Sequence, residues 1–290
     1  MGVKGYKAFD KGLVCLDKQY SENMVFEEHG TNICAEGMMH FCKKPYDVLQ
    51  YYPLVNNNGE LNDFAEVEAF GIVKERGTKC GTNKLKIGHK LSFDEFVEAS
   101  TECLDEVKNG PDYIFDDVTS SERMDVIGST VGYGSKIASS GDLSSIFSIG
   151  MRVKIGSCGD GAQIATTGFG TKIASSGHIA RIGSSSCRAQ IGSAGDSAYI
   201  HSSGNESKIG SVGDYAVVKM VGENSIAAAI GHYSRASGKK GDWIILAEWT
   251  TSVGDGRSRP TCVKVGYIDG EILKEDTFYM LIDGEFKECE

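Results

Sequence analysis

The sequence predicts a mainly β protein: an N-terminal α+β domain, then a parallel β-solenoid or β-roll of nine-residue repeats, then a β-rich C-terminal cap. Three observations predict this fold. Isoleucine recurs every nine residues from Ile137 to Ile209, glycine recurs at a second fixed phase, and residues 1–107 carry larger hydrophobic side chains in non-repeating order. A short fixed period indicates stacked units that bury their apolar face only against their neighbours.

Residues 1–107 are expected to form the α+β domain, which we interpret as a recognition module. Strands are predicted over residues 7–16, 24–27, 37–42, 64–73 and 84–87 from their apolar patterns. A short helix is expected over 45–52, because Pro45 suits a first helical turn. Ser92 and Glu95 have the spacing of a capping box. The helix that follows would bury one apolar face, formed by Phe93, Phe96, Val97, Cys103, Leu104 and Val107.

The remaining boundaries follow from changes in composition. Residues 108–126 are polar and are expected to form a linker, and residues 127–236 hold the repeats. Residues 237–290 lose the period and alternate β-prone runs with Gly-containing turns. An open solenoid end exposes unpaired strand edges, so this last segment is predicted to be a cap.

The repeat unit predicts a thin core. Counting Ile137 as position one, positions eight, one and three alternate along an extended segment and should all point inward. Position five is glycine in nearly every copy, from Gly141 to Gly231. We interpret this glycine as a bend that requires a positive φ.

The true period is 18 residues, because the variable positions alternate between copies. One ladder therefore falls along one edge of the roll, at Asp142, Asp160, His178, Asp196, Asp214 and His232. Asp after Gly suits turn chemistry, in which the carboxylate accepts backbone N–H groups. Calcium is the alternative, although calcium-binding nonapeptides place Asp two residues after Gly in every copy.

A second ladder occupies position nine on one flat face, at Lys136, Lys154, Lys172 and Lys208. A solvated face is one interpretation. An anion-binding or acidic-partner surface is the other, because closely spaced like charges gain from a counter-charge.

The 290-residue chain has a net charge of −10, which argues against direct nucleic-acid binding and favours a partner with a basic surface. No apolar run approaches the length of a membrane span, so no membrane contact is expected. The N-terminus lacks the apolar region of a secretory signal, which predicts a cytoplasmic location. The nine cysteines are scattered, with no C-x-x-C pair. We expect neither a metal nor a cofactor, and the oligomeric state is left open.

Two resemblances bear on the origin of the chain. Residues 37–53, 66–71 and 83–88, with the Ile-Gly-Ser-Ser-Gly-Asp repeats, resemble an uncharacterised protein family found in bacteriophages, prophages and gut Firmicutes. This resemblance implies that the cytoplasm is that of a bacterial host. Residues 222–236 are similar to the β-roll heads of trimeric autotransporter adhesins, which supports the roll.

Two functions are consistent with these features. The first is a non-enzymatic protein-interaction scaffold of a phage or mobile element, which binds and inhibits a host defence factor. The second is an enzyme, because the N-terminal domain resembles ADP-ribosyltransferases. In that resemblance His29-Gly30-Thr31 corresponds to a nucleotide-binding strand, residues 37–41 with Tyr51 to the next motif, and Glu66 or Glu68 to a catalytic glutamate.

Overall fold

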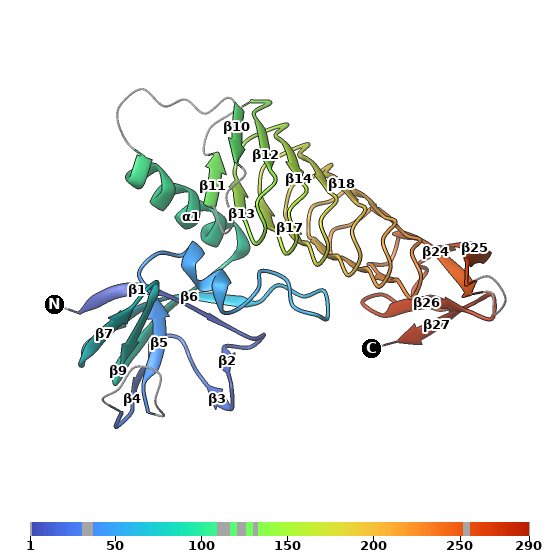
Figure 1. Ribbon diagram of the computed structural model, residues 1–290. Helices are drawn as coiled ribbons and strands as arrows, with labels where there is room; N and C mark the ends of the chain where they lie inside the picture. The colour runs from blue at the N-terminus through green and yellow to red at the C-terminus, as the bar shows by residue number, and fades with distance from the viewer. Residues whose placement is uncertain are drawn as a thin grey trace. The chain divides into compact units, whose positions relative to one another are not determined.

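A computed structural model describes residues 2–30, 37–108, 117–120, 126–129, 133–251 and 256–289. The chain divides into two compact units (Figure 1). The N-terminal unit comprises residues 1–54 and 61–109, and the solenoid unit comprises residues 55–60 and 110–290. Residues 55–60 lie inside the predicted N-terminal domain, yet they group with the solenoid.

The N-terminal unit is built on a seven-stranded antiparallel sheet with the order β4-β9-β6-β1-β5-β8-β7. Its strands are β1 (Val3–Phe9), β4 (Val25–Glu27), β5 (Met39–Cys42), β6 (Asp63–Ala69), β7 (Val73–Arg76), β8 (Lys79–Thr82) and β9 (Lys84–Leu91). A separate hairpin pairs β2 (Val14–Cys15) with β3 (Lys18–Gln19). The short 3-10 helix η1 (Tyr46–Gln50) lies where a short helix is predicted.

The first predicted strand is wrong in its position. Residues 7–16 were expected to be extended, but β1 ends at Phe9 and a turn follows. Leu13 and Leu16 have φ angles of 60° and 54°, a left-handed conformation that leucine rarely adopts. The chain reverses here because Asp63 accepts the N–H groups of Gly12 and Leu13 at 2.8 and 3.0 Å. A contact so distant in the sequence leaves no local signal.

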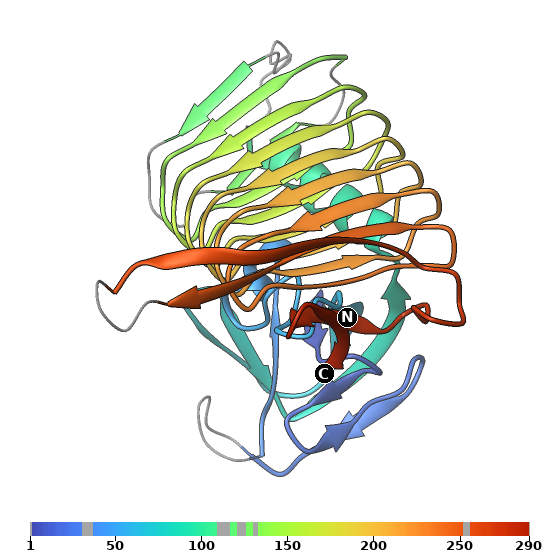
Figure 2. The same ribbon diagram turned by 90° about the vertical axis from the view of Figure 1, so that its right-hand side faces the viewer.

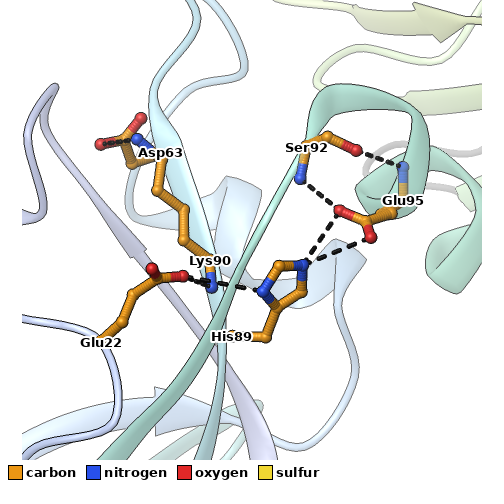
Figure 3. Close-up of polar contacts among 6 residues, drawn as sticks. All are labelled: Glu22, Asp63, His89, Lys90, Ser92 and Glu95. Carbon is orange, nitrogen blue, oxygen red and sulfur yellow. Dashed lines mark hydrogen bonds and ion pairs between the residues drawn. The ribbon is translucent and has the colours of Figure 1, made fainter.

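The predicted capping box is confirmed at the start of helix α1 (Phe93–Lys108). The Ser92 N–H donates to Glu95 Oε2 at 2.7 Å, and the Glu95 N–H donates to Ser92 Oγ at 3.3 Å (Figure 3). His89 Nε2 lies 3.3 Å from each Glu95 carboxylate oxygen, and Glu22 contacts the other side of His89 and the Lys90 N–H. This network fixes the junction between β9 and α1.

Two nine-stranded sheets form the solenoid, and Figure 2 shows their strands stacked coil upon coil. The lysine sheet, named for its lysine ladder, contains β10 (Asp117–Ser120), β12 (Lys136–Ser139), β14 (Lys154–Ser157), β16 (Lys172–Ser175), β18 (Gln190–Ser193), β20 (Lys208–Ser211), β22 (Ile226–Ala229), β24 (Trp243–Thr251) and β25 (Ser258–Tyr267). The second sheet contains β11 (Val126–Ser129), β13 (Ser145–Ser148), β15 (Gln163–Thr166), β17 (Arg181–Ser184), β19 (Tyr199–Ser202), β21 (Val217–Met220), β23 (Arg235–Ser237), β26 (Phe278–Ile282) and β27 (Glu285–Cys289).

The 18-residue coil is confirmed. Each strand pairs in parallel with the strand 18 residues later, so Ile137 lies beside Ile155 and Ile146 beside Ile164. The solenoid makes about six turns. Its first coil begins earlier than predicted, because β10 lies inside the expected linker of residues 108–126 and pairs with β12.

The interior of the solenoid is a column of isoleucine flanked by small residues. Ile146, Ile164, Ile182 and Ile200 are fully buried, and the alanines at position eight are buried beside them. Serine or threonine at position three also points inward, as at Ser175 and Thr166. The predicted inward face is therefore confirmed.

The reason given for the repeated glycine is wrong. With the exception of Gly168, none of the described position-five glycines has a positive φ. A Cβ on Gly195 would lie 2.0 Å from the carbonyl oxygen of Gly177 in the preceding coil, and one on Gly231 would lie 1.9 Å from that of Gly213. Close stacking of backbone on backbone excludes a side chain here. The positive φ occurs two residues later, at position seven, as in Leu143, Ile179 and Tyr215.

The C-terminal cap is confirmed as two hairpins. β24 pairs in parallel with β22, and β25 then pairs antiparallel with β24. In the second sheet, β26 joins β23 antiparallel and β27 extends it. Each sheet therefore changes from parallel to antiparallel pairing after its last coil.

Residues 55–60 lie on the outer surface of the second sheet. The Arg181 guanidinium bonds the Val55 carbonyl and Asn57 Oδ1, the latter at 2.9 Å. His201 Nδ1 lies 3.0 Å from the Gly59 carbonyl oxygen, and Lys219 forms a 2.8 Å ion pair with Glu60. Three side chains from successive strands of this sheet are therefore already bonded to residues 55–60.

Candidate functional site

The lysine ladder forms a continuous row on the outer surface of the lysine sheet. In the strand register Lys136 lies beside Lys154, Lys154 beside Lys172, Lys172 beside Gln190, and Gln190 beside Lys208. All five side chains are exposed. Neighbouring coils are about 4.8 Å apart, so the stems of consecutive lysines begin at this spacing.

A shallow groove runs beside the lysine row. The next outward position along each strand is alanine or glycine, so nothing rises above the backbone there. The groove has a volume of about 920 Å³, and its floor includes Ala138, Gly156, Ala174, Gly192 and Gly210. An extended chain lying along this groove would have lysines along one side.

Arginine and aromatic side chains border the other side of the lysine row. The Arg152 guanidinium lies 5.3 Å from the Tyr133 ring centre, and that of Arg188 lies 5.4 Å from the Phe169 ring centre. Tyr133, Phe169 and both arginines line a hollow of about 570 Å³ together with Lys154 and Lys172. Arg188 also pairs with Glu206 at 2.6 Å. We call the lysine row, the groove and this border the lysine face.

Sequence reasoning missed Arg152 and Arg188 as members of this surface. Both occupy position seven of the same 18-residue phase, just before strands of the lysine sheet. Each arginine stands two residues before a position of the lysine row, and this spacing could have revealed them. Arginine occupies that position in only these two copies, however, so the sequence shows no ladder of arginines.

The ladder of aspartate and histidine stacks the coils on one another. Asp142 Oδ1 accepts the Asp160 N–H at 2.9 Å, and Asp160 Oδ1 accepts the His178 N–H at 2.7 Å. The chain of acceptors continues through His178 Nδ1, Asp196 Oδ1 and Asp214 Oδ1, which accept the N–H groups of Asp196, Asp214 and His232 at 3.2, 2.8 and 2.7 Å. The aspartates accept backbone N–H groups, as the turn-chemistry interpretation expects, but these groups belong to the next coil and not to the same turn. A role of this ladder in partner binding stays a prediction.

Charge is unevenly divided along the chain. Residues 127–236 hold nine lysines and arginines against six aspartates and glutamates, although the whole chain has a net charge of −10. Four of those six acids are the ladder aspartates, and Glu206 pairs with Arg188. The acidic excess therefore belongs to the segments outside the repeats, and the lysine face is a basic surface on an acidic protein.

The residues of the ADP-ribosyltransferase resemblance lie on different elements of the N-terminal unit. His29 is exposed beside Gly30, whose N–H bonds the Gly37 carbonyl at 2.7 Å; Thr31 is outside the described residues. Tyr51 follows η1, and its hydroxyl lies 3.1 Å from Thr78 Oγ1. Glu68 lies on β6 between Lys4 and Lys86. Tyr51 and Glu68 border two different hollows.

The structure also bears on metal binding and on membrane spanning. Within the described ranges, no three His, Cys, Asp or Glu side chains gather as a metal site would require. In the same part of the chain, no helix combines the length and the apolar character that crossing a membrane demands. The eight cysteines that the structure describes are free thiols.

The comparison with known protein families finds a match in the N-terminal region. Residues 3–99 are similar to a domain of unknown function, DUF7666. This match covers the strands of the N-terminal sheet and the start of α1, and it stops before the repeats. No curated protein and no solved structure matches the chain. A DUF7666-like domain joined to a β-solenoid is consistent with an uncharacterised family.

Proposed function

We propose that the chain is a non-enzymatic binding protein whose solenoid presents the lysine face to a protein partner with an acidic surface. The observation that carries this proposal is the in-register row of lysines beside a smooth groove. Among the described residues, no carboxylate forms an ion pair with Lys154, Lys172 or Lys208.

Electrostatics favours an acidic partner on this face. Ammonium groups one coil apart repel each other by roughly 1 kcal/mol in water, and by more where solvent is excluded. A partner that places carboxylates along the row relieves this repulsion and speeds its own association. The strand register holds the backbone of these lysines at fixed spacing, so the backbone needs little reorganisation on binding.

The resemblance to phage and prophage proteins supports a host factor as the partner. A host factor with a basic surface is the alternative that the net charge suggests. Such a partner would bind the acidic segments outside the repeats, because the solenoid itself carries a basic excess. We propose that the protein acts by binding and inhibiting a host defence factor.

The ADP-ribosyltransferase alternative stays a prediction. No observation favours it, since Tyr51 and Glu68 border separate hollows. Incubation with labelled NAD tests it, and transfer or hydrolysis that depends on Glu68 would support it.

The proposal is tested by partner capture with two charge-matched variants. The face variant carries Lys154→Glu, Lys172→Glu and Lys208→Glu. The control carries Lys11→Glu, Lys74→Glu and Lys287→Glu, three exposed lysines outside the repeats, and has the same net charge. We expect one host protein to be captured by the wild type and the control but not by the face variant. Equal capture by both variants would contradict the proposal.

A further inference from the structure

The N-terminal unit buries a lysine with no acidic partner. Lys7 lies on β1 and is 5 % exposed. Its ammonium donates to Cys15 Sγ at 3.3 Å and to the His40 carbonyl oxygen at 3.1 Å. Within the described part of the chain, no aspartate or glutamate pairs with it. Burial lowers the pKa of Lys7, because a buried cation without a counter-charge is costly.

The ammonium of Lys7 keeps unused donor capacity. A lysine ammonium has three N–H donors, and Cys15 Sγ and the His40 carbonyl oxygen engage two of them. The rings of Phe9 and Tyr20, whose centres lie 5.2 and 5.4 Å from Nζ, contribute cation–π attraction but no formal charge. An anion within reach of the third donor would supply the missing counter-charge.

A cavity of about 210 Å³ adjoins this lysine. It lies where β1 and β5 separate, since these two strands share only the pair Tyr6 and Cys42. Its polar lining consists of lysine, cysteine, histidine and tyrosine, with no aspartate or glutamate. Its apolar lining includes Phe41 and Val48. The cavity is therefore apolar in its walls and positive in its charge.

His40 adds a second unsatisfied group to the cavity. Its Nε2 is buried and has no hydrogen-bond partner. Burial, with the positive charges of Lys79 and Lys7, lowers the pKa of His40 to about 4. The imidazole is neutral at pH 7, so its Nε2 can carry the proton and donate to an anion.

The mouth of the cavity is formed by a strained turn. Leu13 and Leu16 flank Cys15 with left-handed φ angles, and Leu16 is 84 % exposed at the rim. The Tyr52 hydroxyl donates to Cys15 Sγ at 3.2 Å and fixes the turn from the other side. Backbone strain of this kind persists where the surrounding structure enforces it, and it concentrates at binding sites.

We propose that this cavity binds a small carboxylate with a one-ring apolar body. Its carboxylate accepts from Lys7 Nζ and His40 Nε2, and its body packs between Phe41 and Val48. The size is suitable, because benzene fills a cavity of about 150 Å³ in another protein. Lys79 provides a second positive charge at the mouth.

Benzoate is the probe that tests this proposal on the full chain. We expect a dissociation constant on the order of 1 mM or below by isothermal titration calorimetry. Benzyl alcohol, a neutral molecule of similar shape, should bind at least about tenfold more weakly, because it cannot neutralise Lys7. Saturation with inorganic phosphate but not benzoate, or with neither ligand, would overturn the proposal.

Lys7→Met separates binding from structure. Methionine matches the length of lysine without its charge, so we expect benzoate affinity to fall at least about tenfold and resistance to urea to stay equal or rise. Lys11→Met, which removes an exposed lysine, should change neither. Unchanged benzoate affinity in Lys7→Met would overturn the proposal. If that variant does not fold, the ¹⁵N resonance of His40 Nε2 in the wild type decides, since benzoate must shift it.

Discussion

The solenoid and the N-terminal unit are stabilised by contacts of different kinds. In the solenoid one set of contacts recurs every 18 residues, so five backbone N–H groups in successive coils each donate to a side-chain acceptor at the same position of the preceding coil. In the N-terminal unit the contacts do not recur, and some of them join distant residues, as when Asp63 accepts the N–H groups of Gly12 and Leu13. A repeated contact, or a local one such as the capping box of Ser92 and Glu95, can be detected in the sequence, whereas a unique contact between distant residues cannot.

The largest expected effect lies in the N-terminal core. The Phe96 ring is fully buried and stacks on Phe64 with ring centres 3.9 Å apart. Phe96→Ala should lower the free energy of unfolding by about 3–5 kcal/mol, because buried contacts are lost and the surrounding core relaxes only partly into the cavity. Urea denaturation of the full chain, followed by circular dichroism, measures it. Phe93→Ala removes a half-buried ring and should cost less; an equal cost would contradict the assignment of the core.

The second-largest loss of stability is expected where the backbones of neighbouring coils approach each other closely. Gly195→Ala places a Cβ 2.0 Å from the Gly177 carbonyl oxygen, so two coils must separate. We expect a loss of about 1–3 kcal/mol in unfolding free energy. Gly192→Ala is the matched control, because the nearest atom to its Cβ would be 3.9 Å away. If the two variants are equally stable, steric exclusion does not explain the repeated glycine.

A smaller effect is expected from the acceptor ladder. Asp160→Ala removes the acceptor of the His178 N–H and should cost about 1–2 kcal/mol. Asp160→Asn keeps an Oδ1 acceptor and should cost less. Chemical denaturation of both variants gives the comparison. A larger loss for asparagine than for alanine would show that the ladder does not act through this hydrogen bond.

The smallest effect is a pH dependence at the start of α1. The N–H and hydroxyl of Ser92, and then His89, hold the pKa of the Glu95 carboxyl below its ordinary value. The carboxylate therefore stabilises the fold above the pKa of the unfolded chain, and this contribution disappears as pH falls through the lower folded pKa. Glu95→Gln should flatten the acid limb of the stability profile. If the variant and the wild type lose stability equally at low pH, the Glu95 carboxylate does not stabilise the start of α1 in this way.

The sequence predicted most of the solenoid and the lysine row, because Ile137 to Ile209 and Lys136 to Lys208 display their period openly. It failed where the cause was an unrepeated contact. The turn after Phe9 depends on Asp63, and leucine at positions 13 and 16 gives no sign of a left-handed backbone. The strands β7 and β8 were also missed, since their sequences are short and largely polar.

The N-terminal cavity shows the same limit. Lys7 differs from Lys4 only in the face of β1 on which it lies, and that face is decided by pairing with β6. His40 lies within the predicted strand of residues 37–42, and nothing in the sequence there indicates a binding role. Its unpartnered Nε2 becomes visible only once β5, β1 and the β2–β3 hairpin are in place.

The central claim is that the solenoid is a scaffold and its lysine face a binding surface. Binding of poly-L-glutamate at low salt tests it most directly, with the face variant compared with the charge-matched control. We predict that Lys154→Glu, Lys172→Glu and Lys208→Glu together weaken binding at least about tenfold, while the control changes it less than about twofold. Equal weakening by both variants, or tighter binding of single-stranded DNA than of poly-L-glutamate, would contradict the claim.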